Sequence, residues 1–394
     1  MLLITFVCPG LGILSSGILT VFWSKGRFLV VIVFILGLGY LGFFYEPRTI
    51  DDMWRYIQYM SYIDTSSLKD FLRQILVERF SVHGLDSSQW PGSGVLLYLT
   101  AKYGNYRILS AGALIVTYCS RLLTVQGNYL SAQRQNNVRY SLWMGAMLVT
   151  VLPYLVLSGF RWYLSISTLM VGLYFEIKHG FRLRNLWFYV LATTFHPAAL
   201  IFTALRLIPL FVSKNKNERV LVYTVTLIAT VIGFIESNRI IHELTSLSTH
   251  FWAYIRSIST MQLIDNLINC AVLILILIAV IQLRKQYQYR STLNYLIVLI
   301  IVDIVMVTFD VFTRLVQYTI PASVIILSQI SFSSHANEKL KVWELLIPVA
   351  VFLLGVLELI VISYQSIPPV SLAWKDILLT PIFNMQSWIW GVLH

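Results

Sequence analysis

The sequence predicts an all-α polytopic membrane protein, and three observations carry that prediction. Hydrophobic residues make up 57% of the 394 positions and charged residues only 12%, whereas soluble domains carry about 25% charged residues. Mean hydropathy is +0.74 over the whole chain. Apolar runs long enough to cross a bilayer recur from one end to the other. These features exclude an ordinary soluble enzyme, a disordered chain and a collagen-like chain.

Charge-poor runs of about 17–25 residues are the candidate transmembrane helices. Ten such runs are found, and the first is expected to be a retained span because no basic segment precedes its apolar core. The ten predicted spans are 2–22, 28–45, 104–121, 140–158, 162–178, 220–236, 262–283, 293–309, 315–331 and 342–363.

Residues 185–213 allow two topologies, because His196-Pro197 interrupts the apolar run. Either 185–205 is one span, or 185–196 and 198–213 are the two legs of a short hairpin. Basic residues gather on the cytoplasmic side of membrane proteins, and only the hairpin puts all six basic clusters on one side. We therefore predict the hairpin, with both termini outside. The clusters are Lys25/Arg27, Arg121/Arg134/Arg139, Lys178/Arg182/Arg184, Lys214/Lys216/Arg219, Arg284/Lys285/Arg290 and Lys339/Lys341.

This topology makes 1–394 a single integral membrane domain. The outer loops 46–103 and 237–261 and the tail 364–394 are expected to cap the outer side, where the functional site is predicted. No soluble domain is available to bind ATP or a nucleotide sugar, and no Walker A, G-x-G-x-x-G or H-E-x-x-H motif occurs.

The net charge of +11 comes from 29 Lys+Arg against 18 Asp+Glu. A nucleic-acid partner would need a basic soluble domain, and the sequence has none. The three cysteines lie in apolar runs, which is typical of packing residues and not of disulfides or a zinc site. We expect no metal and no cofactor.

The segment 49–59 is the richest in candidate functional side chains. In a helix, Asp52, Arg55, Tyr56 and Tyr59 share one face. A carboxylate can accept a hydroxyl proton, and a guanidinium can bind phosphate oxygens in a bidentate manner. The competing interpretation is a helix start with an internal Asp–Arg ion pair. Asp51 and Asp52 side by side also permit binding of a divalent ion.

Other ionisable residues lie near predicted span ends or within the apolar runs. Arg161 follows a tight turn with no acidic neighbour in sequence, which favours an anion-binding role over simple snorkelling to the interface. His196 stands at the turn of the predicted hairpin, and such groups are costly at membrane depth unless they serve a function or are satisfied by backbone.

Asp310, Arg314 and Tyr318 follow one another at four-residue spacing near the outer end of a span. This spacing fits a stabilising ion pair or an arginine presented to a pyrophosphate. Arg206 lies inside the second hairpin leg and must be paired or face water. Asp303 and Glu358 lie within spans, and their spacing assigns them no role.

Four of these motifs together resemble the Wzy-type O-antigen and exopolysaccharide polymerases of the EpsG-like branch. They are Asp52-x-x-Arg55-Tyr56-x-x-Tyr59, the arginine after a short outer turn (Arg161), Phe195-His196-Pro197-Ala198-Ala199-Leu200, and Arg314-x-x-x-Tyr318. They occur in the family's order between about 50 and 330. Trp162 departs from the pattern, because the family often has Gln after the arginine.

The resemblance implies a GT-C-like glycosyltransferase in the bacterial inner membrane, with its site facing the periplasm. It would move a growing glycan from undecaprenyl pyrophosphate onto the non-reducing end of a lipid-linked oligosaccharide repeat, without nucleotide or cofactor. Its implied partners are this lipid-linked oligosaccharide, the bilayer, a chain-length regulator and a flippase, but no nucleic acid.

For this reaction the expected pyrophosphate- and substrate-binding residues are Arg161, Arg314, Arg55, Tyr56, Tyr318 and Arg206. Arginines would stabilise the charge on the leaving pyrophosphate. The expected acceptor bases are Asp52, then Asp51, then His196, acting in a single inverting displacement.

Three alternatives stay open at this point. An O-antigen ligase would attach polymer without affecting chain growth. A glycosyltransferase using a polyprenyl-phosphate sugar would also fit the acidic pair Asp51-Asp52. A lipid-linked oligosaccharide flippase would predict internal repeats, of which the sequence shows none by inspection.

Overall fold

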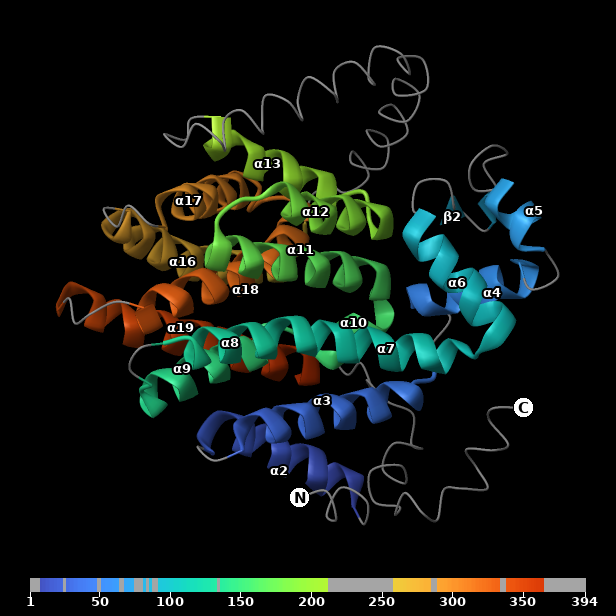
Figure 1. The fold of residues 1–394 in the computed structure, drawn as a ribbon, viewed down its shortest axis with the longest axis horizontal. Helices are drawn as coiled ribbons and strands as arrows, with labels where there is room; N and C mark the ends of the chain where they lie inside the picture. Colours follow the sequence, from blue (N-terminus) through green and yellow to red (C-terminus); the bar gives the residue numbers. More distant parts are fainter. Residues whose placement is uncertain are drawn as a thin grey trace.

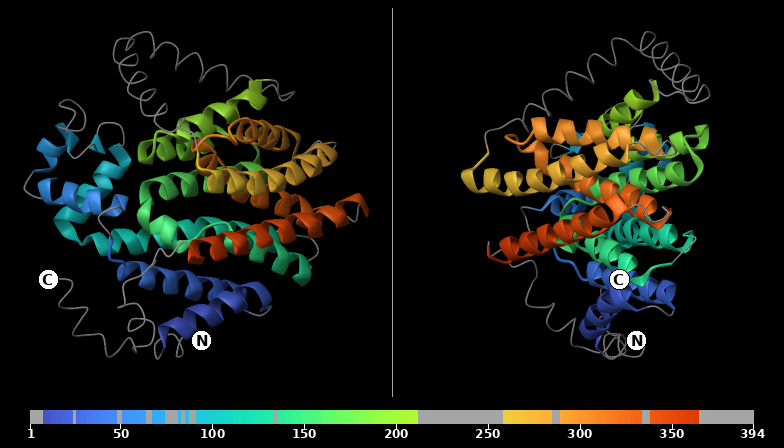
Figure 2. Two further views of the ribbon diagram at one scale, coloured as in Figure 1. Left: turned by 180° about the vertical axis from the view of Figure 1, so that it is seen from behind. Right: turned by 90° about the vertical axis from the view of Figure 1, so that its left-hand side faces the viewer.

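The computed structural model describes residues 8–23, 26–47, 51–63, 67–73, 81–82, 85–86, 91–132, 135–211, 258–284, 289–333 and 338–364. Over these residues the protein is α-helical, apart from two antiparallel two-residue strands, β1 (Ser81–Val82) and β2 (Leu85–Asp86). The long helices lie side by side in one bundle (Figures 1 and 2). The all-α class predicted from composition is therefore confirmed.

Three helical segments in the described part of the chain are each long and apolar enough to cross a membrane: Tyr106–Leu130, Gln262–Leu283 and Val311–Ser333. Shorter apolar helices cover Pro9–Phe22, Arg27–Phe43 and Ala199–Leu210. The protein is thus membrane-embedded, while the predicted count of ten spans stays a prediction. The span expected at 220–236 lies outside the described residues.

The first helices pack through small residues. Helix α2 (Pro9–Phe22) lies against α3 (Arg27–Phe43), which in turn lies along α7 (Tyr106–Tyr118). A Cβ added at Gly39 would stand 2.6 Å from Ile115, and one at Gly42 would stand 3.0 Å from the carbonyl oxygen of Ser110. Glycine therefore permits the close backbone approach that membrane helices use for association.

Helix α7 does not end where the sequence predicts. It continues through a π-helical turn at Cys119–Leu123 into α8 (Thr124–Leu130). Arg121 lies in that turn and is fully buried, so its assignment to a cytoplasmic basic cluster is wrong. The physical reason is that the apolar pattern of 122–125 extends the helix by more than two turns beyond the predicted end.

The predicted span 140–158 is broken into two helices. Helix α9 (Asn137–Val149) ends before a short connection, and α10 (Pro153–Ser158) begins at a proline. Proline lacks the N–H needed inside a helix but is well suited to a helix's first turn. After Gly159 the chain enters the long helix α11 (Phe160–His179).

The apolar run that contains His196-Pro197 forms two helices, α12 (Leu183–Phe195) and α13 (Ala199–Phe211). They contact each other, and the chain reverses between them (Figure 1). This arrangement is the helical hairpin that the sequence predicts. Helix α12 packs along α11, and α13 packs on α17 (Arg290–Val305).

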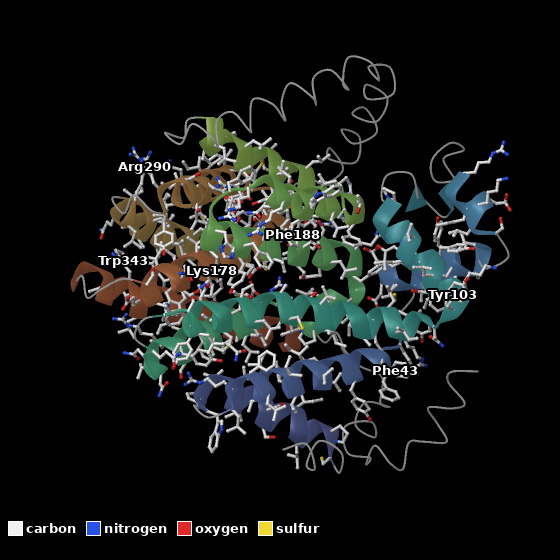
Figure 3. All side chains as sticks on the ribbon, viewed as in Figure 1. Phe43, Tyr103, Lys178, Phe188, Arg290 and Trp343 are labelled. Carbon is white, nitrogen blue, oxygen red and sulfur yellow. The ribbon has the colours of Figure 1, made fainter. Side chains whose placement is uncertain are left out.

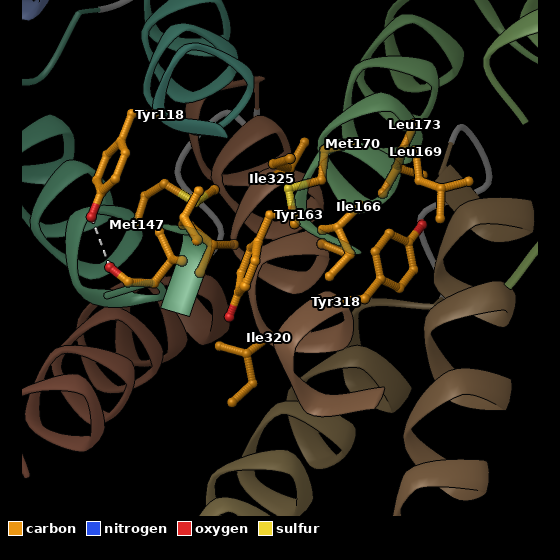
Figure 4. Packing of buried hydrophobic residues seen from close by; sticks show 14 of the residues in the cluster. Tyr118, Met147, Tyr163, Ile166, Leu169, Met170, Leu173, Tyr318, Ile320 and Ile325 are labelled. Atoms are coloured by element: carbon orange, nitrogen blue, oxygen red, sulfur yellow. Dashed lines mark hydrogen bonds between the residues drawn. The ribbon is translucent and has the colours of Figure 1, made fainter. Parts of the chain in front are cut away.

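The centre of the bundle is α18 (Val311–Ser333), which is buried on nearly all sides. Arg314 is the one charged residue of this helix, and a helix with so little charge suits the interior of a helical assembly. Around it lie α8, α11, α16 (Thr260–Leu283) and α19 (Glu338–Tyr364). Figure 4 shows part of this core, with Tyr118 and Tyr318 at opposite sides of the drawn cluster and Tyr163 between them.

One end of the bundle carries described basic residues from several of the predicted cytoplasmic clusters. Arg27 bonds Asn137 at the start of α9, Arg139 pairs with Glu344 at the start of α19, and Lys178 bonds Ser131 after α8. Figure 3 shows Lys178, Arg290 and Trp343 toward this end, with Phe43 and Tyr103 toward the other. The hairpin topology predicts this shared end. If 185–205 were one span, Arg290 and Lys178 would be expected at opposite ends of the bundle.

The opposite end carries the predicted outer loop 46–103. Its described parts are α4 (Asp52–Ile63), α5 (Leu68–Arg73), the two strands and α6 (Pro91–Tyr103). Of the other predicted outer pieces, 237–257 and 365–394 lie outside the described residues. The candidate functional site lies at this end.

Candidate functional site

A polar cavity of about 310 Å³ opens where α4, α10, α11, the α12–α13 turn and the start of α18 meet. We call it the arginine cavity, because Arg161 and Arg314 both line it. Asp52, Tyr56 and His196 also face it. Residues separated by up to 262 positions in sequence are thus brought to one place.

Arg161 stands in the first turn of α11, directly after the Gly159 turn. Its Nε donates to the hydroxyl of Tyr56 at 2.6 Å, and its guanidinium lies 4.7 Å from the centre of the Tyr56 ring. The Tyr56 ring is in turn packed edge-on against Phe160. The side chain of Arg161 is therefore held toward the cavity by a neutral phenol.

Tyr56 is buried, and burial raises the pKa of its phenol to about 12, although the charge of Arg161 opposes this. The group therefore stays neutral at physiological pH and acts as a hydrogen-bonding support for Arg161.

His196 follows the last residue of α12, and its Nδ1 accepts a hydrogen bond from the backbone N–H of Ala198 at 3.2 Å. Its ring packs edge-on against Trp162, whose Nε1 donates to Gln317. The pKa of His196 lies well below its ordinary value, first because of desolvation and then because of the charges of Arg161 and Arg314. A neutral imidazole whose Nδ1 accepts carries its proton on Nε2, so His196 is a donor.

The first two turns of α18 contribute Asp310, just before the helix, with Thr313, Arg314 and Gln317. Asp310 accepts a hydrogen bond of 2.6 Å from the Nε2 of Gln262 on α16. Tyr318 does not line the cavity. It is fully buried on the side facing α13 and α17, bonds Tyr295 and packs on Phe202.

Asp52 begins α4 and lines the cavity. Its carboxylate lies 3.5 Å from the guanidinium of Arg55, and both side chains are about half exposed. Arg55 does not line the cavity. The expected face of α4 is therefore narrower than the sequence predicts: Asp52 and Tyr56 point to the cavity, while Arg55 pairs with Asp52.

Asp51 is only 2% exposed and does not line the cavity. Its two carboxylate oxygens accept hydrogen bonds from Tyr45 at 2.7 Å and Tyr154 at 2.9 Å. The residue therefore ties the start of α4 to the end of α3 and to α10, so the two neighbouring aspartates have different surroundings.

Arg206 lies on α13, away from the arginine cavity. It forms an ion pair with Glu176 of α11 and hydrogen bonds with Ser291 of α17, and both charged side chains are 2% exposed. Tyr189 donates a further hydrogen bond to Glu176. The requirement that Arg206 be paired is met inside the protein.

Sequence reasoning missed Gln317, Tyr154 and Tyr163, which also line the cavity. Gln317 could have been found, because it follows Arg314 by three residues and so shares its helix face. Tyr154 and Tyr163 show no such relation to the other candidates, and only the packing of α10 and α11 reveals them.

The arrangement combines two guanidinium groups, an imidazole N–H and a carboxylate around one cavity of about 310 Å³. Such a set can bind an anion and accept a proton from a neutral group. No group of three or more His, Cys, Asp or Glu side chains suited to a metal occurs in the part of the chain that the structure describes.

The fold and cavity define an α-helical membrane protein with a polar, arginine-lined cavity at one end of its bundle. The sequence model of the EpsG family matches residues 27–369, and the chain belongs to that family. The family is one of exopolysaccharide-polymerase-like membrane proteins, associated with glycosyltransferase-like polymerase activity. No curated protein and no solved structure matches the chain.

Proposed function

We propose that this protein is a polysaccharide polymerase of a bacterial inner membrane, with a GT-C-like architecture and its site on the periplasmic side. It would transfer a growing glycan from undecaprenyl pyrophosphate to the non-reducing end of a lipid-linked oligosaccharide repeat. The observation that carries the proposal is the convergence of Arg161, Arg314, His196 and Asp52 on one cavity. Membership of the EpsG family supports it.

In the proposed reaction the acceptor hydroxyl attacks the anomeric carbon, and the bond from that carbon to the pyrophosphate oxygen breaks. Undecaprenyl pyrophosphate leaves with the bonding electron pair. Arg161 and Arg314 would stabilise the charge that develops on it, since preorganised donors act strongly in a water-poor site. The hydroxyl proton would pass to a carboxylate within hydrogen-bond reach.

Asp52 suits the base role best, because it lines the cavity, whereas Asp51 is occupied by two tyrosine hydroxyls. The hydrogen bond from Ala198 leaves the Nε2–H of His196 as the group available to a substrate. We therefore assign His196 a donor role toward the pyrophosphate or sugar in place of the base role. Arg206 and Tyr318 would support the fold around the site.

The test is the length distribution of polymer made in cells that carry single variants. We expect Arg161→Ala and Arg314→Ala each to lower polymerisation by about 10²–10³-fold, the usual cost of removing one transition-state donor. Arg182→Ala is the matched control, because Arg182 is an exposed arginine at the other end of the bundle. A normal polymer ladder from both cavity variants, at normal protein level, would contradict the pyrophosphate assignment.

The same cells distinguish the rival activities. A ligase would leave chain growth intact and lose only the attachment of polymer to its final carrier. A glycosyltransferase that adds single sugars would depend on a polyprenyl-phosphate sugar. A flippase would leave lipid-linked repeats on the cytoplasmic side when the variants are inactive.

A further inference from the structure

A second and larger cavity, of about 500 Å³, lies beside the arginine cavity. We call it the side cleft. Its walls are the α9–α10 connection, the first half of α16, the first half of α18 and the second half of α19. The side cleft is at the same end of the bundle as the arginine cavity, and Leu155, Tyr163, Thr313 and Gln317 line both.

The charge of the side cleft is opposite to that of the arginine cavity. The carboxyl groups of Asp265 on α16 and Glu358 on α19 line it, and no lysine or arginine is among its lining residues. An anion such as a pyrophosphate is therefore disfavoured there. A neutral group with hydroxyls to donate is favoured, because carboxylates are strong hydrogen-bond acceptors.

Two buried polar atoms in the wall point to the same kind of occupant. The Oδ1 of Asn269 and the hydroxyl of Tyr163 have no hydrogen-bond partner, although both side chains are more than nine-tenths buried. The Nδ2 of Asn269 is already used, because it donates to the carbonyl oxygen of Asp265. In Figure 4 the Tyr163 hydroxyl lies on the side of Ile320, another residue of the side cleft.

A hydrocarbon chain in the side cleft would leave these atoms unsatisfied, which is unfavourable for buried polar atoms. A hydroxyl-bearing ligand would satisfy both. The apolar part of the wall also suits a sugar ring, whose faces are apolar between the hydroxyls.

The side cleft also has a route to the bilayer. Ile264 and Ile268 of α16 line it and are 49% and 40% exposed. The neighbouring helix α19 likewise exposes apolar side chains, among them Leu353 and Leu357. A molecule anchored in the membrane can therefore reach the side cleft between these two helices without passing through water.

From these observations we infer that the side cleft binds the terminal saccharide of the acceptor, the lipid-linked repeat, and presents its hydroxyl to the arginine cavity across Tyr163 and Gln317. The inference rests on the proposed polymerase function and extends it. The donor pyrophosphate takes the arginine cavity, so the acceptor must approach from a second direction. In the part of the chain that the structure describes, the side cleft shares a wall with the arginine cavity and so offers such a direction.

The experiment uses the full-length protein in nanodiscs. Lipid-linked polymer, the donor, is held at a saturating concentration, and the concentration of the lipid-linked repeat is varied. The repeat is extracted from a host that lacks this protein. Ile268→Trp places a bulky ring at the mouth of the side cleft. Leu267→Trp is the matched control, because Leu267 is 51% exposed on the same helix and does not line the cleft. Thermal unfolding of both variants checks that they are folded.

We expect Ile268→Trp to raise the KM for the repeat by about tenfold or more, equivalent to a loss of about 1.4 kcal/mol in binding. Asn269→Leu should raise this KM by about fivefold to tenfold, since it removes an acceptor without leaving a void. Leu267→Trp should stay within twofold of the wild type. Inhibition by inorganic pyrophosphate, which probes the arginine cavity, should be unchanged in all three variants.

The outcomes separate the two proposals. If Ile268→Trp behaves as Leu267→Trp does while the wild type makes polymer, the inference on the side cleft is wrong and the polymerase function stands. If the defect vanishes for a repeat on a short, water-soluble lipid, the side cleft holds hydrocarbon and the inference is equally wrong. If the wild type makes no polymer from these substrates, the proposed function fails and this inference fails with it.

Discussion

Arg161 and Arg206 make an instructive comparison, because the sequence assigns both to an anionic substrate. Arg206 is enclosed at 2% exposure against Glu176, and a neighbouring serine and tyrosine complete its network. Arg161 is held by a neutral tyrosine hydroxyl and lines a cavity. An arginine in a membrane protein must be compensated. A buried carboxylate does this for Arg206, whereas the side chain of Arg161 lines a cavity, where an anionic ligand could reach it.

The largest effect expected from this comparison is on folding. Arg206→Met should abolish folded protein, because it leaves the Glu176 carboxylate buried and uncompensated, at a cost of about 3–5 kcal/mol. The double variant Arg206→Met/Glu176→Gln should recover most of the loss, since the glutamine still accepts from Tyr189. The amount of monodisperse protein in mild detergent measures both. Equal yields of the single and double variants would show that the ion pair does not govern stability.

A smaller effect is expected to distinguish the role of Asp51 from that of Asp52. Asp51→Ala removes the acceptor of two tyrosine hydroxyls and should lower the melting temperature. Asp52→Asn should leave melting unchanged and reduce turnover by about 10²–10⁴-fold, the usual contribution of a positioned general base. Melting temperature and polymer yield are measured on both variants. If Asp51→Ala proved fully stable but inactive, the roles of the two aspartates would be exchanged.

The smallest effect concerns the pH response of His196. Its lowered pKa in the folded protein means that the imidazole stays neutral where a free histidine, with a pKa of about 6.5, takes up a proton. Stability from this group is therefore fully present above pH 6.5 and is lost as the pH falls below that value, because the unfolded chain then binds a proton that the folded chain does not. His196→Gln should show a weaker loss of melting temperature between pH 7 and pH 5. Identical pH curves for the two proteins would contradict the lowered pKa.

Much of the fold follows from local pattern. His196-Pro197 predicts the break between α12 and α13, because proline removes a helical hydrogen bond and its preceding residue tends to avoid helical geometry. The rule is only a tendency, since Pro321 and Pro348 lie inside α18 and α19. The break at Pro153 follows from the same rule, although the apolar run around it suggested a continuous span. The burial of Arg121 was not predictable, since the π-helical turn that contains it has no sequence signature.

The site was predictable only in part for a related reason. Helical spacing places Asp52 with Tyr56, and Arg314 near Gln317, on common faces, and the structure brings these residues to one cavity. Helical spacing does not reveal which neighbouring helix covers a given helix face. Tyr318, only one turn after Arg314, is covered by α13 and α17, and the partners of Arg206 lie 30 and 85 residues away in sequence.

The contact of Arg206 with Glu176 and Ser291 also bears on how the chain is assembled in the membrane. Glu176 is synthesised before Arg206, but Ser291 is synthesised 85 residues after it. The hairpin therefore acquires its complete set of hydrogen bonds only when α17 has been inserted. Because His196 stands at the tip of that hairpin, this wall of the arginine cavity is fixed late in biosynthesis, when α4, α10 and α11 have been made and only α18 has still to follow.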